Sequence, residues 1–143
     1  MTLYLDTSIL VKLYIDEPDA AEIHDVARRA DVIVTSAAAY AEARAAFARR
    51  RRGRLMTRAE TAAAVRQLDG DWPRFVRVTL DDELARTAGL LADRHGLRGY
   101  DAIHLASFEQ ILARCDGDDV CFLSADDRLT RAARALGLRT RAL

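Results

Sequence analysis

The 143-residue sequence has little of what several common classes of protein require. Its two cysteines, Cys115 and Cys121, match no metal-ligand spacing, so we expect reduced thiols rather than a disulfide framework or a zinc site. No apolar run approaches the ~20 residues that span a membrane. No basic segment followed by an apolar block opens the chain, so we expect a cytoplasmic protein without a signal peptide or membrane contact. Lys12 is the only lysine, and every other basic side chain apart from histidine is arginine.

What the sequence does contain is an alternation of strand and helix patterns. Half of its residues are apolar, and the length suits a single domain over residues 1–143 with a buried core. The predicted strands are 3–6, 32–34, 75–80, 120–123 and, weakly, 138–142. The predicted helices are 8–15, 20–30, 37–52, 57–68, 82–94, 100–114 and 127–136. This alternation favours an α/β fold with a central parallel sheet of about five strands and helices on both faces.

Several helix ends can also be predicted from local residue types. Asp19 is a candidate cap for the second helix, and Thr35 with Ser36 is a candidate cap for the third. Gly70 and the residues up to Pro73 are expected to end the fourth helix.

Two carboxylates follow directly after apolar strands. Asp6 comes after residues 3–5, and Asp126 comes shortly after residues 120–123. Ligands of open α/β sheets bind at the carboxyl ends of the strands, so the two side chains meet there if their strands are neighbours. The alternative for each residue is that it only caps the helix that follows.

Two further carboxylates lie inside predicted helices. Glu42 has only alanines as same-face neighbours, and a buried unpaired charge costs several kcal/mol, so we expect a cationic partner such as Arg98. Asp101 lies near the start of its helix, where the helix dipole favours an anion by roughly 0.3–1 kcal/mol and keeps the carboxylate charged. Four such acids, with no clustered histidine or thiolate, suit an oxygen-preferring cation, Mg²⁺ or Mn²⁺.

A resemblance to a known family is carried by four motifs in order. LDTS contains Asp6, YAEA contains Glu42, YDAIHLA contains Asp101, and SADDRL contains Asp126. Across essentially the whole chain these resemble the PIN-domain nucleases, and most of all the VapC toxins of bacterial toxin–antitoxin pairs. The resemblance implies a three-layer sandwich around a parallel sheet. It also assigns catalysis and metal binding to the four acids named above.

The same resemblance assigns supporting roles to other residues. Ser8 and Ser124 match the hydroxyls near the family's acids. The Asp126–Asp127 doublet leaves the fourth acid open by one position, and Asp126 is preferred because it lies nearer the strand end. Asp127 is expected to be solvated or capping, with contact to a second ion as the alternative.

The function that the resemblance implies is a Mg²⁺-dependent endoribonuclease, with Mn²⁺ as a possible substitute. Its partners would be an RNA substrate, a cognate antitoxin protein and a second copy of the chain in a homodimer. Two alternatives stay open. One is the same chemistry in RNA processing or DNA cleavage without an antitoxin, and the other is a module that binds RNA or protein without turnover.

The candidate contacts with the substrate come from arginines and, less directly, from histidines. The run Arg49, Arg50, Arg51 and Arg52 is a candidate phosphate-binding segment, with a solvated helix end or a protein-binding surface as alternatives. A metal-free ribonuclease usually needs paired histidines as base and acid, whereas the three histidines here are scattered. Of these, only His104 lies near the acids, and we interpret it as a packed or orienting helix residue, with contact to the substrate or to a ligand carboxylate as the alternative.

Overall fold

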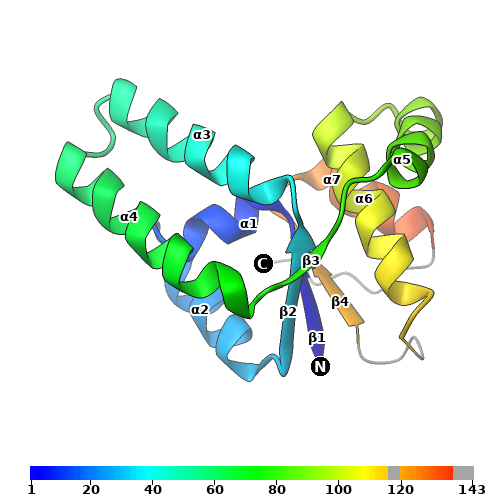
Figure 1. The fold of residues 1–143 in the computed structure, drawn as a ribbon, viewed down its shortest axis with the longest axis horizontal. Coiled ribbons are helices and arrows are strands. Elements are labelled where there is room, and N and C mark those ends of the chain that lie inside the picture. The colour runs from blue at the N-terminus through cyan, green and yellow to red at the C-terminus, as the bar shows by residue number, and fades with distance from the viewer. Residues whose placement is uncertain (116–119, 137–143) are drawn as a thin grey trace.

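The structure is a computed structural model that describes residues 1–115 and 120–136. Its described residues form one parallel sheet of four strands in the order β3-β2-β1-β4 (Figure 1). The expected α/β fold with a parallel sheet is therefore confirmed, with four described strands where we expected about five. The strand expected at 138–142 lies outside the described residues. The strands are β1 (Thr2–Leu5), β2 (Val32–Ser36), β3 (Val76–Val78) and β4 (Val120–Leu123).

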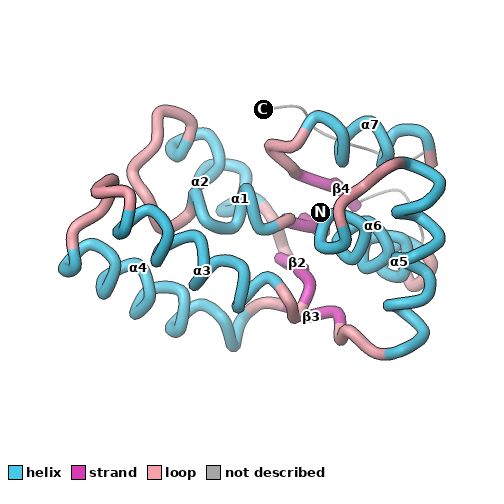
Figure 2. Tube along the Cα trace, turned by 90° about the horizontal axis from the view of Figure 1, so that it is seen from above, coloured by secondary structure: helices cyan, strands magenta, loops and turns pink. Residues whose placement is uncertain are grey.

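Helices cover both faces of the sheet, as the sequence predicts. Figure 2 shows one group of helices on one side of the sheet and a second group on the other. The first group is α1 (Thr7–Lys12), α2 (Ala20–Arg29), α3 (Ala39–Arg52) and α4 (Arg58–Asp71), with the short 3-10 helix η1 (Trp72–Arg74) after α4. The second group is α5 (Asp82–His95), α6 (Gly99–Leu112) and α7 (Asp127–Ala135).

Strand β1 lies between two hydrophobic cores because its side chains alternate between the faces of the sheet. Tyr4 points into the core under α5, α6 and α7, where its ring contacts Phe108 and Phe122. Leu3 and Leu5 point into the core under α1 to α4. All three β1 side chains are fully buried, so the position of the strand end is fixed from both faces.

The start of α3 differs from the prediction. Thr35 and Ser36 continue β2 and pair with β3 instead of capping the helix. The Thr35 hydroxyl donates to the carbonyl of Leu5 at 2.8 Å, which is a contact between β2 and β1. The N-cap residue of α3 is Ala38, which has no side-chain cap, although the Ser36 hydroxyl accepts from the Ala38 amide at 3.2 Å.

The end of α4 and the start of α2 also differ from expectation. Helix α4 continues through Gly70 to Asp71, because an exposed glycine weakens a helix by about 1 kcal/mol without breaking it. Asp19 occupies the N-cap position of α2 but makes no cap hydrogen bond. Its carboxylate instead pairs with Lys12, the last residue of α1.

Candidate active site

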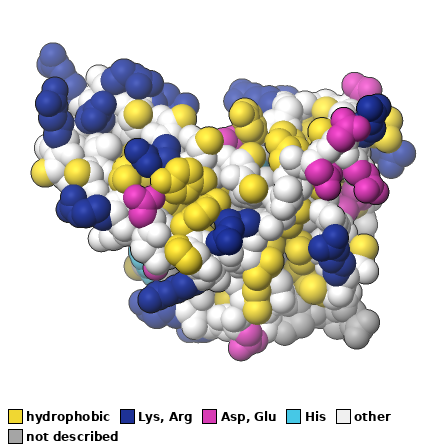
Figure 3. Space-filling view, in the orientation of Figure 1, with side chains coloured by type: hydrophobic (Ala, Val, Ile, Leu, Met, Phe, Trp, Pro, Cys, Tyr) yellow, Lys and Arg dark blue, Asp and Glu magenta, His cyan; other side chains and the backbone are white. Residues whose placement is uncertain are grey.

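A cleft of about 860 Å³ lies at the carboxyl ends of the central strands. One wall comes from α1 and α3 and the other from α6, and in Figure 3 the surface is hollowed between the α3–α4 arm and the rest of the molecule. All four acids singled out in the sequence line this cleft: Asp6, Glu42, Asp101 and Asp126. They come from four separate segments of the chain, which the fold brings to one end of the sheet.

Asp6 is the most firmly held of the four acids. It is 3% exposed, and its carboxylate accepts hydrogen bonds from the Ser8 and Ser124 hydroxyls, each at 2.6 Å. It also accepts from the Ile9 amide at 3.0 Å, so Asp6 caps α1 as well as facing the cleft. The Ser8 hydroxyl in turn accepts from the Ala125 amide at 2.9 Å, which ties the end of β1 to the segment after β4.

Glu42 meets a histidine rather than the arginine that we expected. Its Oε2 accepts from the Thr7 hydroxyl at 2.5 Å and lies 3.1 Å from His104 Nε2. Burial raises the pKa of Glu42, but the hydrogen bonds from His104 and Thr7 outweigh burial and hold the pKa below its ordinary value. Arg98 lines the same cleft, yet among the described residues no arginine forms an ion pair with Glu42.

Asp101 lies in the first turn of α6, in less favourable surroundings. Burial raises its pKa, and the negative charges of Asp126 and Asp6 raise it further, whereas Arg98 and His104 act in the opposite direction. The helix dipole, which we expected to favour the ionised form, is therefore outweighed by burial and by repulsion from the other acids. This repulsion shows that the fold concentrates negative charge in the cleft.

The Asp126–Asp127 doublet divides between two surfaces. Asp126 lines the acidic cleft, and its Oδ1 caps α7 by accepting from the amides of Arg128 and Leu129 at 2.8 and 2.9 Å. Asp127 is exposed and lines a neighbouring depression with Lys12. The cap predicted as the alternative for Asp126 is therefore present together with its place in the cleft.

The four acids fit a divalent cation in chemistry but do not form a ready-made chelate. Over residues 1–115 and 120–136, no three Asp, Glu, His or Cys side chains lie close enough together to hold one ion. The donors are nonetheless all carboxylate oxygens, which Mg²⁺ and Mn²⁺ prefer, and the repulsion at Asp101 is of the kind that a bound cation relieves. Closing such a site requires side-chain movement of the less firmly held acids.

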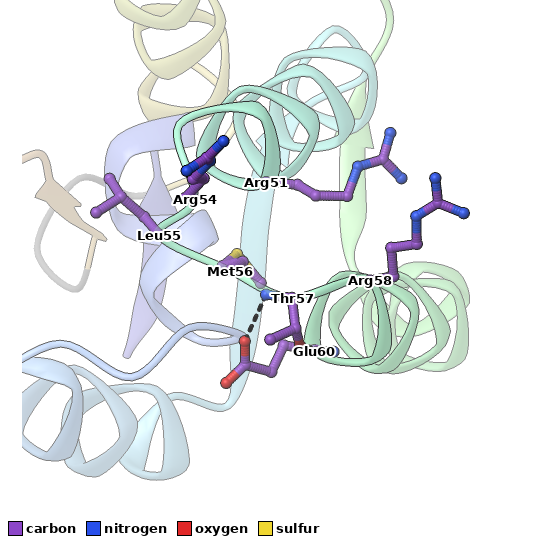
Figure 4. A pocket seen from close by; sticks show the side chains of 7 residues that line it. All are labelled: Arg51, Arg54, Leu55, Met56, Thr57, Arg58 and Glu60. Carbon is purple, nitrogen blue, oxygen red and sulfur yellow. Dashed lines mark hydrogen bonds between the residues drawn. The ribbon is translucent and has the colours of Figure 1, made fainter.

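The arginine run is shared between the cleft and the tip of the α3–α4 arm, over which Figure 3 shows basic side chains gathered. Arg49 and Arg50 line the cleft, and Arg50 is bound to Glu17 at 2.8 Å. Arg51 instead lines a second pocket with Arg54 and Arg58, in which Figure 4 shows Arg51 and Arg58 extending to the same side. Arg52 is exposed near the end of α3.

The sequence patterns do not single out Thr7, and for His104 they favour a packed or orienting role over contact with a carboxylate. Both touch Glu42, and His104 also contacts Tyr4 at the base of the cleft. The signal available was the placement of His104 three residues after Asp101, on the same face of α6. His24 and His95 do not line the cleft.

None of the helices in the described part of the chain has the length and apolar character that a membrane span requires.

Comparison with known proteins agrees with this architecture. The model of the PIN domain family matches residues 3–135. Two relatives from Mycobacterium tuberculosis, "Ribonuclease VapC45" of strain CDC 1551 and "Ribonuclease VapC49" of strain H37Rv, are each 36% identical over 137 residues. Each match covers 95% of this chain and 92% of the relative.

Solved structures show the same fold at lower identity. FitAcB from Neisseria gonorrhoeae matches with a TM-score of 0.69 and 17% identity, over 98% of this chain and 96% of that chain. VapBC2 from Rickettsia felis, bound to a DNA fragment from their promoter, matches with a TM-score of 0.62 and 15% identity, over 99% and 98%. With a family match over most of its length and relatives at 36% identity, this chain belongs to the PIN-domain family and, within it, to the VapC proteins.

Proposed function

We propose that this protein is a divalent-metal-dependent endoribonuclease that acts in the cytoplasm as the toxin of a toxin–antitoxin pair. The observation that carries the proposal is the presence of Asp6, Glu42, Asp101 and Asp126 in one cleft. The relatives at 36% identity are named ribonucleases, which supports RNA as the substrate. Their VapC relationship supports an antitoxin partner, and we further propose a homodimer.

In this proposal the four acids hold the cation, Mg²⁺ or alternatively Mn²⁺. Such an ion activates water as a nucleophile and neutralises charge on the phosphoryl oxygens. The hydroxyls of Ser8 and Ser124 fix Asp6, and Thr7 with His104 fixes Glu42, so two of the acids are oriented before substrate arrives. Hydrolysis then breaks the bond from phosphorus to the 3′ oxygen, which leaves a 5′-phosphate and a 3′-hydroxyl.

The substrate would be held by arginines beside the acids. Arg49 lines the cleft and has no ion pair with a described residue, so its guanidinium is available to an RNA phosphate. Arg50 lines the same cleft but is bound to Glu17, which gives it a smaller share of the role. Arg51 and Arg52 would extend the basic surface toward the tip of the arm.

The test is an RNA-cleavage assay with purified wild type, Asp6→Asn and a matched Asp93→Asn control on α5. Asparagine remains a good N-cap, so Asp6→Asn should fold normally while losing the charge in the cleft. We expect wild type and Asp93→Asn to cleave RNA when Mg²⁺ or Mn²⁺ is added, and Asp6→Asn to lose at least ~100-fold in rate. Undiminished cleavage in EDTA, or by Asp6→Asn, would contradict the proposal.

The toxin role is tested separately in cells. Expression of the wild type should arrest growth, and co-expression of a small protein encoded beside it should restore growth. RNA cleavage in vitro without such a neighbouring gene would instead favour a nuclease of RNA processing.

A further inference from the structure

A buried chain of polar groups connects the core of the molecule to the cleft. The Tyr4 hydroxyl lies 3.0 Å from His104 Nδ1, and the opposite ring nitrogen, Nε2, lies 3.1 Å from Glu42 Oε2. Tyr4 is fully buried and His104 is 2% exposed, whereas Glu42 lines the cleft. The chain therefore crosses from β1 through α6 to α3, three elements far apart in sequence.

The direction of each hydrogen bond follows from the groups at the two ends. His104 Nε2 also lies 2.9 Å from the Thr7 hydroxyl, which gives its one hydrogen to Glu42 Oε2. Neither that hydroxyl nor the Glu42 carboxylate then has a hydrogen for Nε2, so Nε2 must carry a hydrogen and donate. In the neutral imidazole Nδ1 is then an acceptor, and the Tyr4 hydroxyl donates to it. A tyrosine hydroxyl is protonated at neutral pH, so Tyr4 has a hydrogen to donate. Tyr4 thereby selects the tautomer of His104 that can bind Glu42.

The contacts of Glu42 are unequal between its two oxygens. Both the Thr7 hydroxyl and His104 bind Oε2, at 2.5 and 3.1 Å. Oε1 accepts no hydrogen bond from any described residue. The Glu42 side chain is 22% exposed, so Oε1 is open to the cleft instead of being enclosed among internal donors. Here one oxygen is anchored and the other is left for a ligand of the cleft.

We propose that His104 is a positioning residue that holds Glu42 for the divalent cation, and that Tyr4 supports it by fixing the histidine tautomer. This inference rests on the proposed metal-dependent function and adds to it two residues outside the set of four acids. Partners of this kind around metal-binding side chains typically change metal affinity or activity 10–100-fold when they are removed.

Three substitutions separate positioning from mere packing. His104→Leu fills a similar volume and removes both ring nitrogens, whereas His104→Gln keeps an amide donor at comparable reach to Glu42. Tyr4→Phe removes only the hydroxyl and keeps the ring stacked against Phe122. Tyr14→Phe is the matched control, because Tyr14 also donates to a carboxylate, that of Asp71, but lies outside the cleft.

The readouts are Mn²⁺ affinity measured by calorimetry without RNA, the kinetic constants for RNA cleavage, and the melting temperature. We expect His104→Leu to weaken Mn²⁺ binding and lower kcat ~10–100-fold, with the KM for RNA changed by less than ~3-fold. His104→Gln should recover much of that loss. Tyr4→Phe should show a smaller loss in the same direction, and Tyr14→Phe should bind Mn²⁺ and cleave as wild type does.

A double-mutant cycle then tests whether His104 acts through Glu42. In a Glu42→Gln background, His104→Leu should lower Mn²⁺ affinity and kcat by less than ~3-fold further, because the carboxylate it positions is already absent. An equal loss in both backgrounds would overturn the inference. If His104→Leu does not fold, the same cycle is run with Tyr4→Phe.

The outcomes also separate this inference from the proposed function. The inference alone is overturned if the wild type binds Mn²⁺ and cleaves RNA, and folded His104→Leu or Tyr4→Phe binds Mn²⁺ and cleaves RNA equally well. That conclusion holds whether or not the variant changes the melting temperature. Wild type that neither binds Mn²⁺ nor cleaves RNA overturns the proposed function and the inference with it.

Discussion

The four acids of the cleft are held in different ways at the level of single residues. Asp6 and Glu42 are fixed by hydroxyl or imidazole donors, and Asp126 is fixed at one oxygen by backbone amides of α7. Asp101 accepts no hydrogen bond from a described residue and is repelled by Asp126 and Asp6. Asp101 is therefore the acid whose surroundings change most when a cation binds.

Asp101→Asn should stabilise the metal-free protein while abolishing cleavage. The pKa of Asp101 is raised in the fold, so its contribution to stability is present below the pKa of the unfolded chain and is lost as pH rises through the folded pKa. Because the side chain is partly solvated, we expect a gain at pH 7 of less than about 1 kcal/mol, or up to ~4 °C in Tm, and a smaller gain near pH 3.

Calorimetry in the presence of a chelator, at both pH values, measures the effect of Asp101→Asn. A lower Tm for the variant than for the wild type at pH 7 would show that the charge is not strained in the cleft.

The Asp126–Asp127 doublet offers a matched pair of substitutions. Asp126→Asn should reduce RNA cleavage at least ~10-fold, because it removes a carboxylate from the cleft while asparagine keeps the cap of α7. Asp127→Asn should leave the rate within ~2-fold of wild type, since Asp127 is exposed beside the cleft. Equal loss in both variants, measured as kcat on one RNA, would argue against the assignment of Asp126.

At the residue scale, the meeting of two side chains could be predicted from the sequence where each of them follows a strand end. Asp6 and Asp126 follow neighbouring strands β1 and β4, so their convergence follows from topology. The partner of Glu42 was not predictable in the same way. His104 lies 62 residues further along the chain, and its contact with Glu42 depends on how α3 and α6 are placed around the sheet. Local patterns carry no information about that placement.

At the level of elements, the arm formed by α3 and α4 is the main surface to which the four acids of the cleft assign no role. The turn between the two helices is fixed at the start of α4, where Thr57 and Glu60 form a capping box. Arg51 and Arg58, from the facing ends of the helices, make no ion pair with a described residue. We expect this pair to extend the phosphate-binding surface beyond the cleft.

Arg51→Gln combined with Arg58→Gln should raise the KM for RNA several-fold with kcat unchanged. It should also reduce the slope of log affinity against log salt by about 1.4, since each phosphate contact on a single strand contributes ~0.7. Arg86→Gln, on α5 and paired with Asp82, is the control. An unchanged salt slope, with weaker binding of the antitoxin instead, would show that the arm is a protein-binding surface.

Apart from the short helix η1, helix and strand types were predicted correctly for the described elements, because periodicity and apolar runs are local signals. Two of the errors fell at helix ends that are decided by tertiary contacts. Thr35 and Ser36 have the side chains of helix caps, but pairing with β3 keeps them in β2. Asp19 has the side chain of a cap, but Lys12 draws its carboxylate away.

At the scale of the whole molecule, the sheet separates two hydrophobic cores, and the cleft lies where the helices on its two faces meet the ends of β1 and β4. Formal net charge is zero, yet acids gather in the cleft while arginines gather on the arm. This separation of charge suits a cation bound among the acids of the cleft and a polyanion bound across the cleft and the arm.

The central claim is that Asp6, Glu42, Asp101 and Asp126 jointly hold one or more divalent ions. The most direct measurement is a crystal structure of the wild type grown with Mn²⁺, with the ion located by its anomalous scattering. Our account predicts an anomalous peak in the cleft with carboxylate oxygens of at least three of these residues in direct coordination. A fully occupied Mn²⁺ elsewhere, with the cleft acids keeping only the hydrogen bonds described above, would contradict it.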